Sequence, residues 1–260
     1  MDTLAKALIS RASGQSKLRV DDVVICEVDL AMIHDSGGPR RVKPILDRLQ
    51  RQVWDKDKIV VVTDHYVPAD NAETQAIQAL TKQWVQDQSI DKFYDEQGIC
   101  HVVLPERGHL APGLFCVGGD SHSPTGGAFG AYMFGIGATE MAGVLATGEI
   151  WIKVPETILM SWRNQLSAYV TAKDMMLAMC RKIGMGGGRY QAIQYAGQTI
   201  QALSMQERMT LSNMAAELGA QAGLIAPDEA TVAFVQAAGG TVPANWRDFQ
   251  IEAAESAENV

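Results

Sequence analysis

The sequence has few prolines, few basic residues and no long hydrophobic run. Its 260 residues include 9 prolines, and 47% of them are hydrophobic, which is typical of folded globular proteins and not of disordered or fibrous chains. No apolar run reaches the roughly 18 residues that cross a bilayer. The first fifteen residues, MDTLAKALISRASGQ, indicate a short amphipathic helix and contain no signal-peptide cleavage site. We therefore expect a cytoplasmic protein without a membrane partner.

Positive charge is also scarce. The chain has 22 Lys and Arg against 30 Asp and Glu, which gives a net charge of -8. Surfaces that bind nucleic acid need clustered Lys and Arg to neutralise phosphates. The sequence therefore argues against a nucleic-acid partner, although a small local basic site stays open.

The four cysteines form no recognisable ligand motif. Cys26, Cys100, Cys116 and Cys180 are scattered, each has apolar neighbours, and no two of them make a C-x-x-C pair. A single cysteine in an apolar context usually behaves as a small buried hydrophobe. We therefore expect no metal bound by these four residues.

Apolar segments rich in Val and Ile alternate with helical patterns, which predicts an α/β protein with mostly parallel sheets flanked by helices. We divide the chain into a first unit, residues 1–149, and a second unit, residues 150–260, which ends in a helical tail. Predicted strands of the first unit are 23–33, 58–64, 99–105 and 114–120, with helices at 69–88 and 128–148. Predicted for the second unit are strands within 149–162, 190–197 and 223–228, and helices at 171–184, 204–220 and beyond 228.

Polar clusters follow the predicted strands of the first unit. The segments are HDSGG after the first strand, TDHYVP after the second and GDSHSPTGG after the fourth, while His101 falls within the third. In open parallel sheets the ligand lies beyond the carboxyl ends of the strands, so these clusters are expected to converge in one cleft. The side chains concerned are His34, Asp35, Asp64, His65, His101, Asp120, Ser121 and His122.

An aspartate next to a histidine orients the imidazole and raises its basicity, which suits an acid or base near neutral pH. Any one such pair is equally compatible with a structural histidine. Four of the five histidines lie in these positions, however, and scattered structural histidines would rarely do so.

Two further features have open interpretations. Gly126 and Gly127 precede an apolar segment, where they suit either an anion site at a helix N-terminus or tight packing of that segment. Asn213 and Glu217 lie one helical turn apart, on one face of a mostly apolar helix. A pocket contact is favoured over a solvated face for this second pair.

These blocks, in this order, resemble the isopropylmalate dehydratase large-subunit branch of the aconitase superfamily. The resemblance runs through HDSGGP, VTDHYVPADNAET, GICHVVLPERGHLAPG, GGDSHSPTGGAFGAYMFGIGATE and ALSMQERMTLSNMAAELGAQAGLIAPDE, to about residue 232. It implies an aconitase-like fold and a hydro-lyase that dehydrates and rehydrates a hydroxy di- or tricarboxylic acid. The most similar reaction is the isomerisation of 2-isopropylmalate and 3-isopropylmalate in leucine biosynthesis.

The resemblance also implies a 4Fe-4S cluster, with one iron acting as a Lewis acid on the substrate. Asp64 and His65 would protonate the departing hydroxyl. Asp120 and His122 would bond the iron-bound oxygen, and Ser121 would bond a substrate carboxylate. His101 would be oriented by Glu217, and Asn213 would lie by the cluster. His34 and Asp35 would contact the substrate.

The sequence departs from the family pattern in its cysteines. The S-C-T-N and C-x-x-C motifs that hold the cluster are not present, and the proton-abstracting base belongs to a small subunit or further domain. We therefore expect a fragment, half of a split large subunit, or a cluster-free homologue, inactive as this chain alone. The alternatives are a non-enzymatic binding or scaffold protein, and a hydratase for homoaconitate, a dimethylmalate or citrate.

Overall fold

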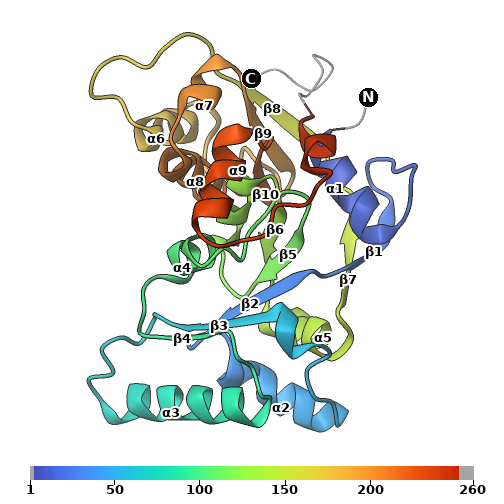
Figure 1. Cartoon of the computed structure of the whole chain (residues 1–260), viewed down its shortest axis with the longest axis vertical. Helices are drawn as coiled ribbons and strands as arrows, with labels where there is room; N and C mark the ends of the chain where they lie inside the picture. The colour runs from blue at the N-terminus through green and yellow to red at the C-terminus, as the bar shows by residue number, and fades with distance from the viewer. Residues whose placement is uncertain (1–2, 252–260) are drawn as a thin grey trace.

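The computed structural model describes residues 3–251, and its central sheet has five parallel strands in the order β4-β3-β2-β5-β6 (Figure 1). The strands are β2 (Leu30–His34), β3 (Ile59–Thr63), β4 (Phe93–Asp95), β5 (Phe115–Gly118) and β6 (Tyr132–Gly135). From β2 the chain moves outward through β3 and β4, and it then returns to the other side of β2 at β5. The order of the strands therefore reverses between β2 and β5, which is where open parallel sheets usually bind ligands.

Both faces of this sheet are covered. On one face Ala31 and Ile33 pack with helices α2 (Pro39–Leu49), α3 (Ala72–Asp87) and α5 (Ala138–Thr147), at the bottom of Figure 1. On the other, Met32 packs with α4 (Cys100–Glu106), α8 (Met205–Asn213) and α9 (Glu229–Ala237). Burial on both sides explains why β2 and β3 are continuous apolar runs without alternation.

The second parallel sheet has the order β10-β9-β8. Its strands are β8 (Thr157–Ser161), β9 (Ala192–Ala196) and β10 (Ala222–Ile225), connected through α6 (Ala172–Ile183), α7 (Gln198–Ala202) and α8. At the start of α8, Ser204 and Glu207 form the reciprocal capping box that their spacing predicts.

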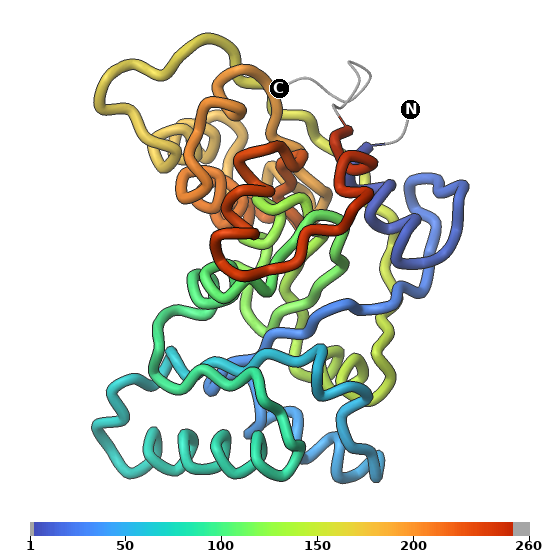
Figure 2. The backbone as a smooth tube through the Cα atoms, viewed as in Figure 1, coloured from blue at the N-terminus to red at the C-terminus, as the bar shows by residue number. Residues whose placement is uncertain are grey.

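The two ends of the described chain lie together. Figure 2 shows the first helix, α1 (Leu4–Ser13), beside the short helix η3 (Trp246–Phe249). The strands β1 (Val23–Glu27) and β7 (Glu149–Lys153) pair antiparallel, and β7 crosses the proposed boundary. The division at residues 149 and 150 stays a prediction. No helix between residues 3 and 251 is long and apolar enough to span a membrane.

Three sequence predictions are wrong in kind. The predicted strand 23–33 is two strands, β1 and β2, in different sheets. It is interrupted at Asp29, whose carboxylate accepts the N–H of Phe115 at 2.8 Å and pairs with Arg11. The predicted strand 99–105 is instead the helix α4. The predicted helix 128–148 is η2 (Ser123–Phe129), then β6, then α5.

Smaller differences concern helix ends. Helix α3 begins at Ala72, three residues later than predicted, and is capped by Asn71 with Thr74. Helix α8 ends at Asn213 and so is shorter than the predicted segment 204–220. The helical tail is represented by η3, and its continuation, residues 252–260, lies outside the described residues.

Candidate active site

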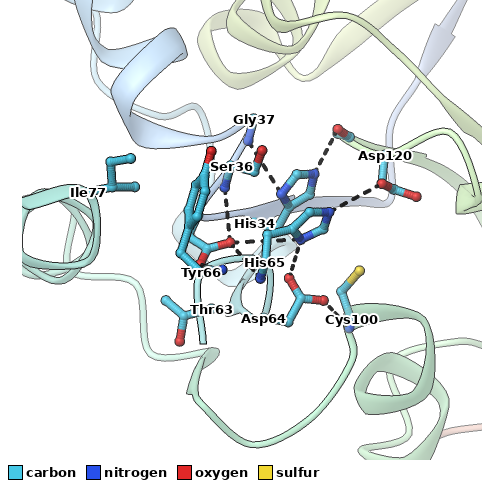
Figure 3. Close-up of polar contacts among 12 residues, drawn as sticks. His34, Ser36, Gly37, Thr63, Asp64, His65, Tyr66, Ile77, Cys100 and Asp120 are labelled. Carbon is cyan, nitrogen blue, oxygen red and sulfur yellow. Dashed lines mark hydrogen bonds and ion pairs between the residues drawn. The ribbon is translucent and has the colours of Figure 1, made fainter. Parts of the chain in front are cut away.

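The loops that follow β2, β3 and β5 carry the site. His34 ends β2, Asp64 and His65 follow β3 directly, and Asp120 follows β5 (Figure 3). Because these strands are parallel neighbours, their carboxyl ends meet at the same edge of the sheet. The imidazole of His34, at the end of β2, reaches the loop after β5, where its Nε2 lies 2.9 Å from the carbonyl oxygen of Gly119.

Asp64 and His65 form the shortest pair of the site. Nδ1 of His65 lies 2.6 Å from Oδ1 of Asp64, and the other carboxylate oxygen accepts the N–H of Cys100 at 2.7 Å. Burial raises the pKa of Asp64, but the bonds from His65 and Cys100 outweigh it and lower that pKa below its ordinary value. Asp64 is thus held ionised, with one oxygen aimed at the imidazole.

His65 also faces a second carboxylate, since its Nε2 lies 3.6 Å from Oδ2 of Asp120. Interactions with Asp120 and Asp64 raise the pKa of His65 to about 10. Its side chain is 35% exposed, so the ring is held between two carboxylates and still open to solvent. A pKa of about 10 keeps His65 an imidazolium at neutral pH.

Asp120 connects three histidines. Its Oδ1 accepts a bond from Nε2 of His101 at 2.8 Å and from the backbone N–H of His122 at 2.7 Å. The bonds from His101 and His65 lower the pKa of Asp120 far below its ordinary value. His101 comes to this position from the first turn of α4, and not from a strand as its sequence context suggested.

His122 pairs with the second unit. Its Nε2 lies 3.1 Å from Oε1 of Glu217, just beyond the end of α8. The pairing expected from the family resemblance, His101 with Glu217, is therefore wrong, because Asp120 takes His101 and Glu217 takes His122. The rings of His101 and His122 meet edge to face, with centroids 6.2 Å apart.

His34 and Asp35, expected to contact substrate, are buried. His34 is 3% exposed, and its ring stacks on His65. The carboxylate of Asp35 is fully buried and accepts the backbone N–H groups of Ser36, His65 and Tyr66 at 3.0 to 3.1 Å. This geometry favours positioning roles, in which both residues fix the loop that presents His65.

Ser121 and Asn213 lie beside the pairs. Oγ of Ser121 is exposed and 3.2 Å from Nδ1 of His122. The side-chain amide of Asn213 donates to Oγ1 of Thr125 at 2.9 Å, and that hydroxyl donates to the carbonyl oxygen of His122. Asn213 is thus connected to the loop of the first unit.

A glycine allows η2 and β10 to come this close. A Cβ on Gly127 would lie 1.9 Å from the carbonyl oxygen of Gly223 in β10, so residue 127 has no room for a side chain at this contact. The structure therefore supports tight packing as the reason for Gly126 and Gly127, since a Cβ on Gly126 would lie 2.6 Å from the sulfur of Met133. The alternative, an anion site at a helix N-terminus, is not supported, since η2 is a seven-residue 3-10 helix.

A cavity of about 500 Å³ opens beside these pairs. His101, Asn213 and Glu217 line it on the polar side, and the remaining wall is formed largely by α8, α9 and α4. Its apolar lining residues are Val102, Met209, Met214 and Phe234. Its volume is within the range of small-molecule sites.

His34 and Asp35 are poor metal ligands in this arrangement. Ligand atoms of His34, Asp35, Asp64 and His65 lie within 4.8 Å of one another. Gly37 N–H donates to Nδ1 of His34 at 3.4 Å, so its Nε2 donates to Gly119 and neither nitrogen is left for a metal. Both oxygens of Asp35 already accept backbone N–H groups.

The cysteines do not fit an iron–sulfur cluster. Cys26, Cys100 and Cys116 are buried and Cys180 half-buried. Cluster ligands must lie close together, but among residues 3–251 the group of His, Cys, Asp and Glu side chains close enough to share a metal contains no cysteine. The described cysteines therefore supply no cluster site.

Three contributors were missed by sequence reasoning: the N–H of Cys100, the hydroxyl of Thr125 and the carbonyl of Gly119. Two of them act through the backbone, which carries no residue-specific signal. Thr125 had a signal, since it lies three residues after His122, a spacing at which a threonine hydroxyl bonds a preceding carbonyl.

Comparison with known proteins identifies relatives along almost the whole chain. A protein of Methanothermobacter thermautotrophicus named as a probable 3-isopropylmalate dehydratase large subunit is 41% identical over 251 residues, 96% of this chain and 59% of its own length. The 3-isopropylmalate dehydratase large subunit 1 of Methanopyrus kandleri is 44% identical, over 92% of this chain and 57% of its own. A probable methanogen homoaconitase large subunit of Methanosarcina mazei is also 44% identical, over 82% and 55%.

The chain thus spans less than two thirds of the length of these relatives. Among solved structures, the holo-form of Thermococcus kodakaraensis aconitase X matches 77% of this chain and 52% of its own, with a TM-score of 0.46 and 9% identity. The model of the aconitase family (aconitate hydratase) matches residues 6–259. With that match and these relatives, the chain belongs to the aconitase family.

Proposed function

We propose that this chain forms the acid–base part of the active site of a hydro-lyase, which removes and restores water on a hydroxy di- or tricarboxylic acid. The observation that carries the proposal is the set of three histidine–carboxylate pairs at one sheet edge. They are His65 with Asp64, His101 with Asp120, and His122 with Glu217. The reaction with the best support is the isomerisation of 2-isopropylmalate and 3-isopropylmalate, because relatives at 41% and 44% identity are named for it.

The pairs suit the removal of a hydroxyl group. Hydroxide is a poor leaving group and needs a proton as the C–O bond breaks. His65 is the proton donor, because its pKa of about 10 keeps it charged while one edge of its ring is open to solvent. In the reverse direction, the neutral His65 takes a proton from the water that adds, and Asp64 holds the ring in place throughout.

Asp120 and His122 act on the same hydroxyl from the other side. Asp120 is ionised and has its Oδ2 directed at His65, so it accepts a hydrogen bond from a hydroxyl placed between them. Glu217 orients His122, and Ser121 offers an exposed hydroxyl to a substrate carboxylate. Asn213 fixes the backbone of this loop through Thr125.

The complete enzyme needs parts beyond these residues. A 4Fe-4S cluster supplies Lewis-acid chemistry in such a site when bound, and we propose that its cysteines lie outside the described residues, since the described ones do not fit. The relatives are named as large subunits, which supports a small-subunit partner. That partner is proposed to supply the base that removes the carbon-bound proton.

A second candidate reaction is the hydration of a homoaconitate-type acid. A relative named as a homoaconitase large subunit is 44% identical, as similar as one of the isopropylmalate dehydratases. The acid–base pairs serve both reactions, because both substrates lose a hydroxyl next to a carboxylate-bearing carbon. The groups that recognise the side chain of the substrate decide between the two reactions.

The test is an assay of the complete enzyme, purified anaerobically with its small subunit and with its iron content measured. It is offered 2-isopropylmalate, 3-isopropylmalate, homocitrate and citrate separately. Turnover of the isopropylmalates with about four irons per protein supports the main proposal. Turnover of homocitrate alone selects the second candidate. Binding without turnover of any of the four acids contradicts the hydro-lyase assignment.

A further inference from the structure

A second cavity, of about 430 Å³, lies at the carboxyl ends of β8, β9 and β10. It shares no lining residue with the active site or with the cavity beside it. Its volume is within the range of small-molecule pockets, and the carboxyl edge of a parallel sheet is the usual place for one. Every strand of the second sheet contributes to its wall, through Ser161, Ala196 and Ile225 among others.

Arg208 is an unusual residue in this wall. It is 1% exposed and therefore a buried cation, which proteins retain only with partners. Its Nη2 donates to the carbonyl oxygen of Gln201 at 2.9 Å and to Oδ2 of Asp228 at 2.6 Å, and its Nε donates to the carbonyl oxygen of Leu203. Gln201 and Asp228 also line the cavity, which places the end of the guanidinium at it.

The remaining nitrogen of Arg208, Nη1, is buried and has no hydrogen-bond partner among residues 3–251. A cationic N–H group without an acceptor is costly, and an acceptor brought by a ligand removes that cost. The two acceptors of Nη2, Gln201 and Asp228, do not serve Nη1, which is left as the unused donor of the guanidinium. Since Arg208 lines the cavity, an anionic oxygen bound there is the acceptor that a ligand can bring to this group.

The charge of the wall indicates how much negative charge the ligand carries. Arg163 and Arg208 are positive, and Asp228 is the acidic residue among those that line the cavity. The Arg208 pair and the N–H of Thr231 outweigh burial and lower the pKa of Asp228, so it is ionised at neutral pH. The lining therefore carries a net charge of one positive unit, which a single carboxylate neutralises.

The apolar part of the wall is formed by Leu159, Ile200, Ile225, Pro227 and Ile251, beside uncharged polar residues such as Ser161, Gln194 and Gln250. We propose that this cavity is a binding site for a small aliphatic carboxylate, with the carboxylate on Arg208 and Arg163 and the hydrocarbon part against the apolar part of the wall. The site is separate from the proposed acid–base chemistry. It therefore holds an effector of the protein and not its reacting substrate.

The test uses the whole 260-residue chain and isovalerate, with isovaleramide as the neutral molecule of the same shape. Binding is followed through the backbone amide signals of Gly197 and Ala226, which line the cavity. We expect isovalerate to shift these signals with a dissociation constant of about 1 mM or tighter. Isovaleramide binds at least about tenfold more weakly, because it lacks the charge.

Two variants locate the contact. Arg163 is exposed and makes no hydrogen bond within the described chain, so Arg163→Gln keeps the fold and is expected to weaken isovalerate binding several-fold. The double variant Arg208→Met with Asp228→Asn removes the buried guanidinium together with its half-buried partner, keeps a helix cap at residue 228 and is expected to abolish binding. Arg181→Gln, on α6 and away from the cavity, is the matched control and leaves binding unchanged.

The proposal is overturned if isovalerate gives no shift at Gly197 and Ala226 up to about 10 mM, or if isovaleramide binds equally well. It is also overturned if the shifts appear only around His101 and Glu217, because the carboxylate then occupies the active-site cavity. Should the double variant fail to fold, the comparison of isovalerate with isovaleramide and the Arg163→Gln variant still decides.

Discussion

The imidazole rings of His34 and His65 are stacked, with centroids 3.9 Å apart and planes 12° apart. Burial and the charge of His65 lower the pKa of His34, while carboxylates raise that of His65. The neutral ring of His34 therefore lies flat on the charged ring of His65. The stack places His65 where the loops after β3 and β5 meet. His34 thus serves the site through His65.

The protonation of this stack is measurable by NMR of the histidine ring nitrogens. At pH 7 we expect both nitrogens of His65 to carry protons, with titration near pH 10, and His34 to carry one on Nε2. Asp64→Asn removes one of the charges beside His65 and should lower its pKa by about 1 to 3 units. A His65 that titrates near 6.5 in the unsubstituted protein would refute this electrostatic picture.

The same pKa predicts how stability depends on pH. The pKa of His65 rises from 6.5 to about 10 on folding, so the protonated ring stabilises the fold fully below pH 6.5. This stabilisation is lost as the pH rises from 6.5 through 10. Urea unfolding across that range should show a decline that His65→Gln reduces. His109→Gln is the control, because burial lowers the pKa of His109 to about 4 and it stays neutral throughout.

The buried carboxylate of Asp35 should contribute strongly to the free energy of unfolding. Asp35→Ala leaves three backbone N–H groups without their acceptor in a fully buried position, which should cost about 3 kcal/mol or more of unfolding free energy. Asp35→Asn keeps one acceptor oxygen and should cost less. Asp47→Ala, an exposed partner of Lys43, should change stability by less than about 0.5 kcal/mol. Equal melting temperatures for all three variants would exclude this role.

The contact between the units is tested with glycines. Gly127→Ala puts a Cβ 1.9 Å from a backbone oxygen of β10, so η2 and β10 must move apart, at a cost of about 1 to 3 kcal/mol. Gly143→Ala is the matched control: it lies exposed in α5 with nothing within 4 Å, and alanine there should stabilise by about 0.5 to 1 kcal/mol. In chemical unfolding the two variants should change the free energy of unfolding in opposite directions. An unchanged free energy for Gly127→Ala would contradict a tight contact.

The sequence predicted the position of a site residue where that residue lies at the end of an apolar strand. His34, Asp64 and Asp120 follow short apolar strands that parallel pairing places at one edge, so their convergence was predictable. The helix α4 was not, because CHVVLPE has the Val-rich composition of a strand and its first N–H is accepted by Asp64, 36 residues away. Pairing across units was equally hidden, since nothing in the order of the chain tells whether Glu217 faces His101 or His122.

The central claim is that His65, held by Asp64, moves the proton of the departing hydroxyl. The measurement that tests it most directly is kcat of the complete enzyme with His65→Gln, Asp64→Asn or His122→Ala, together with the melting temperature of each variant. We predict a fall of about 100-fold or more for each, with cooperative folding retained. Turnover within a few-fold of the unsubstituted enzyme, or loss of folding in place of turnover, would contradict the account.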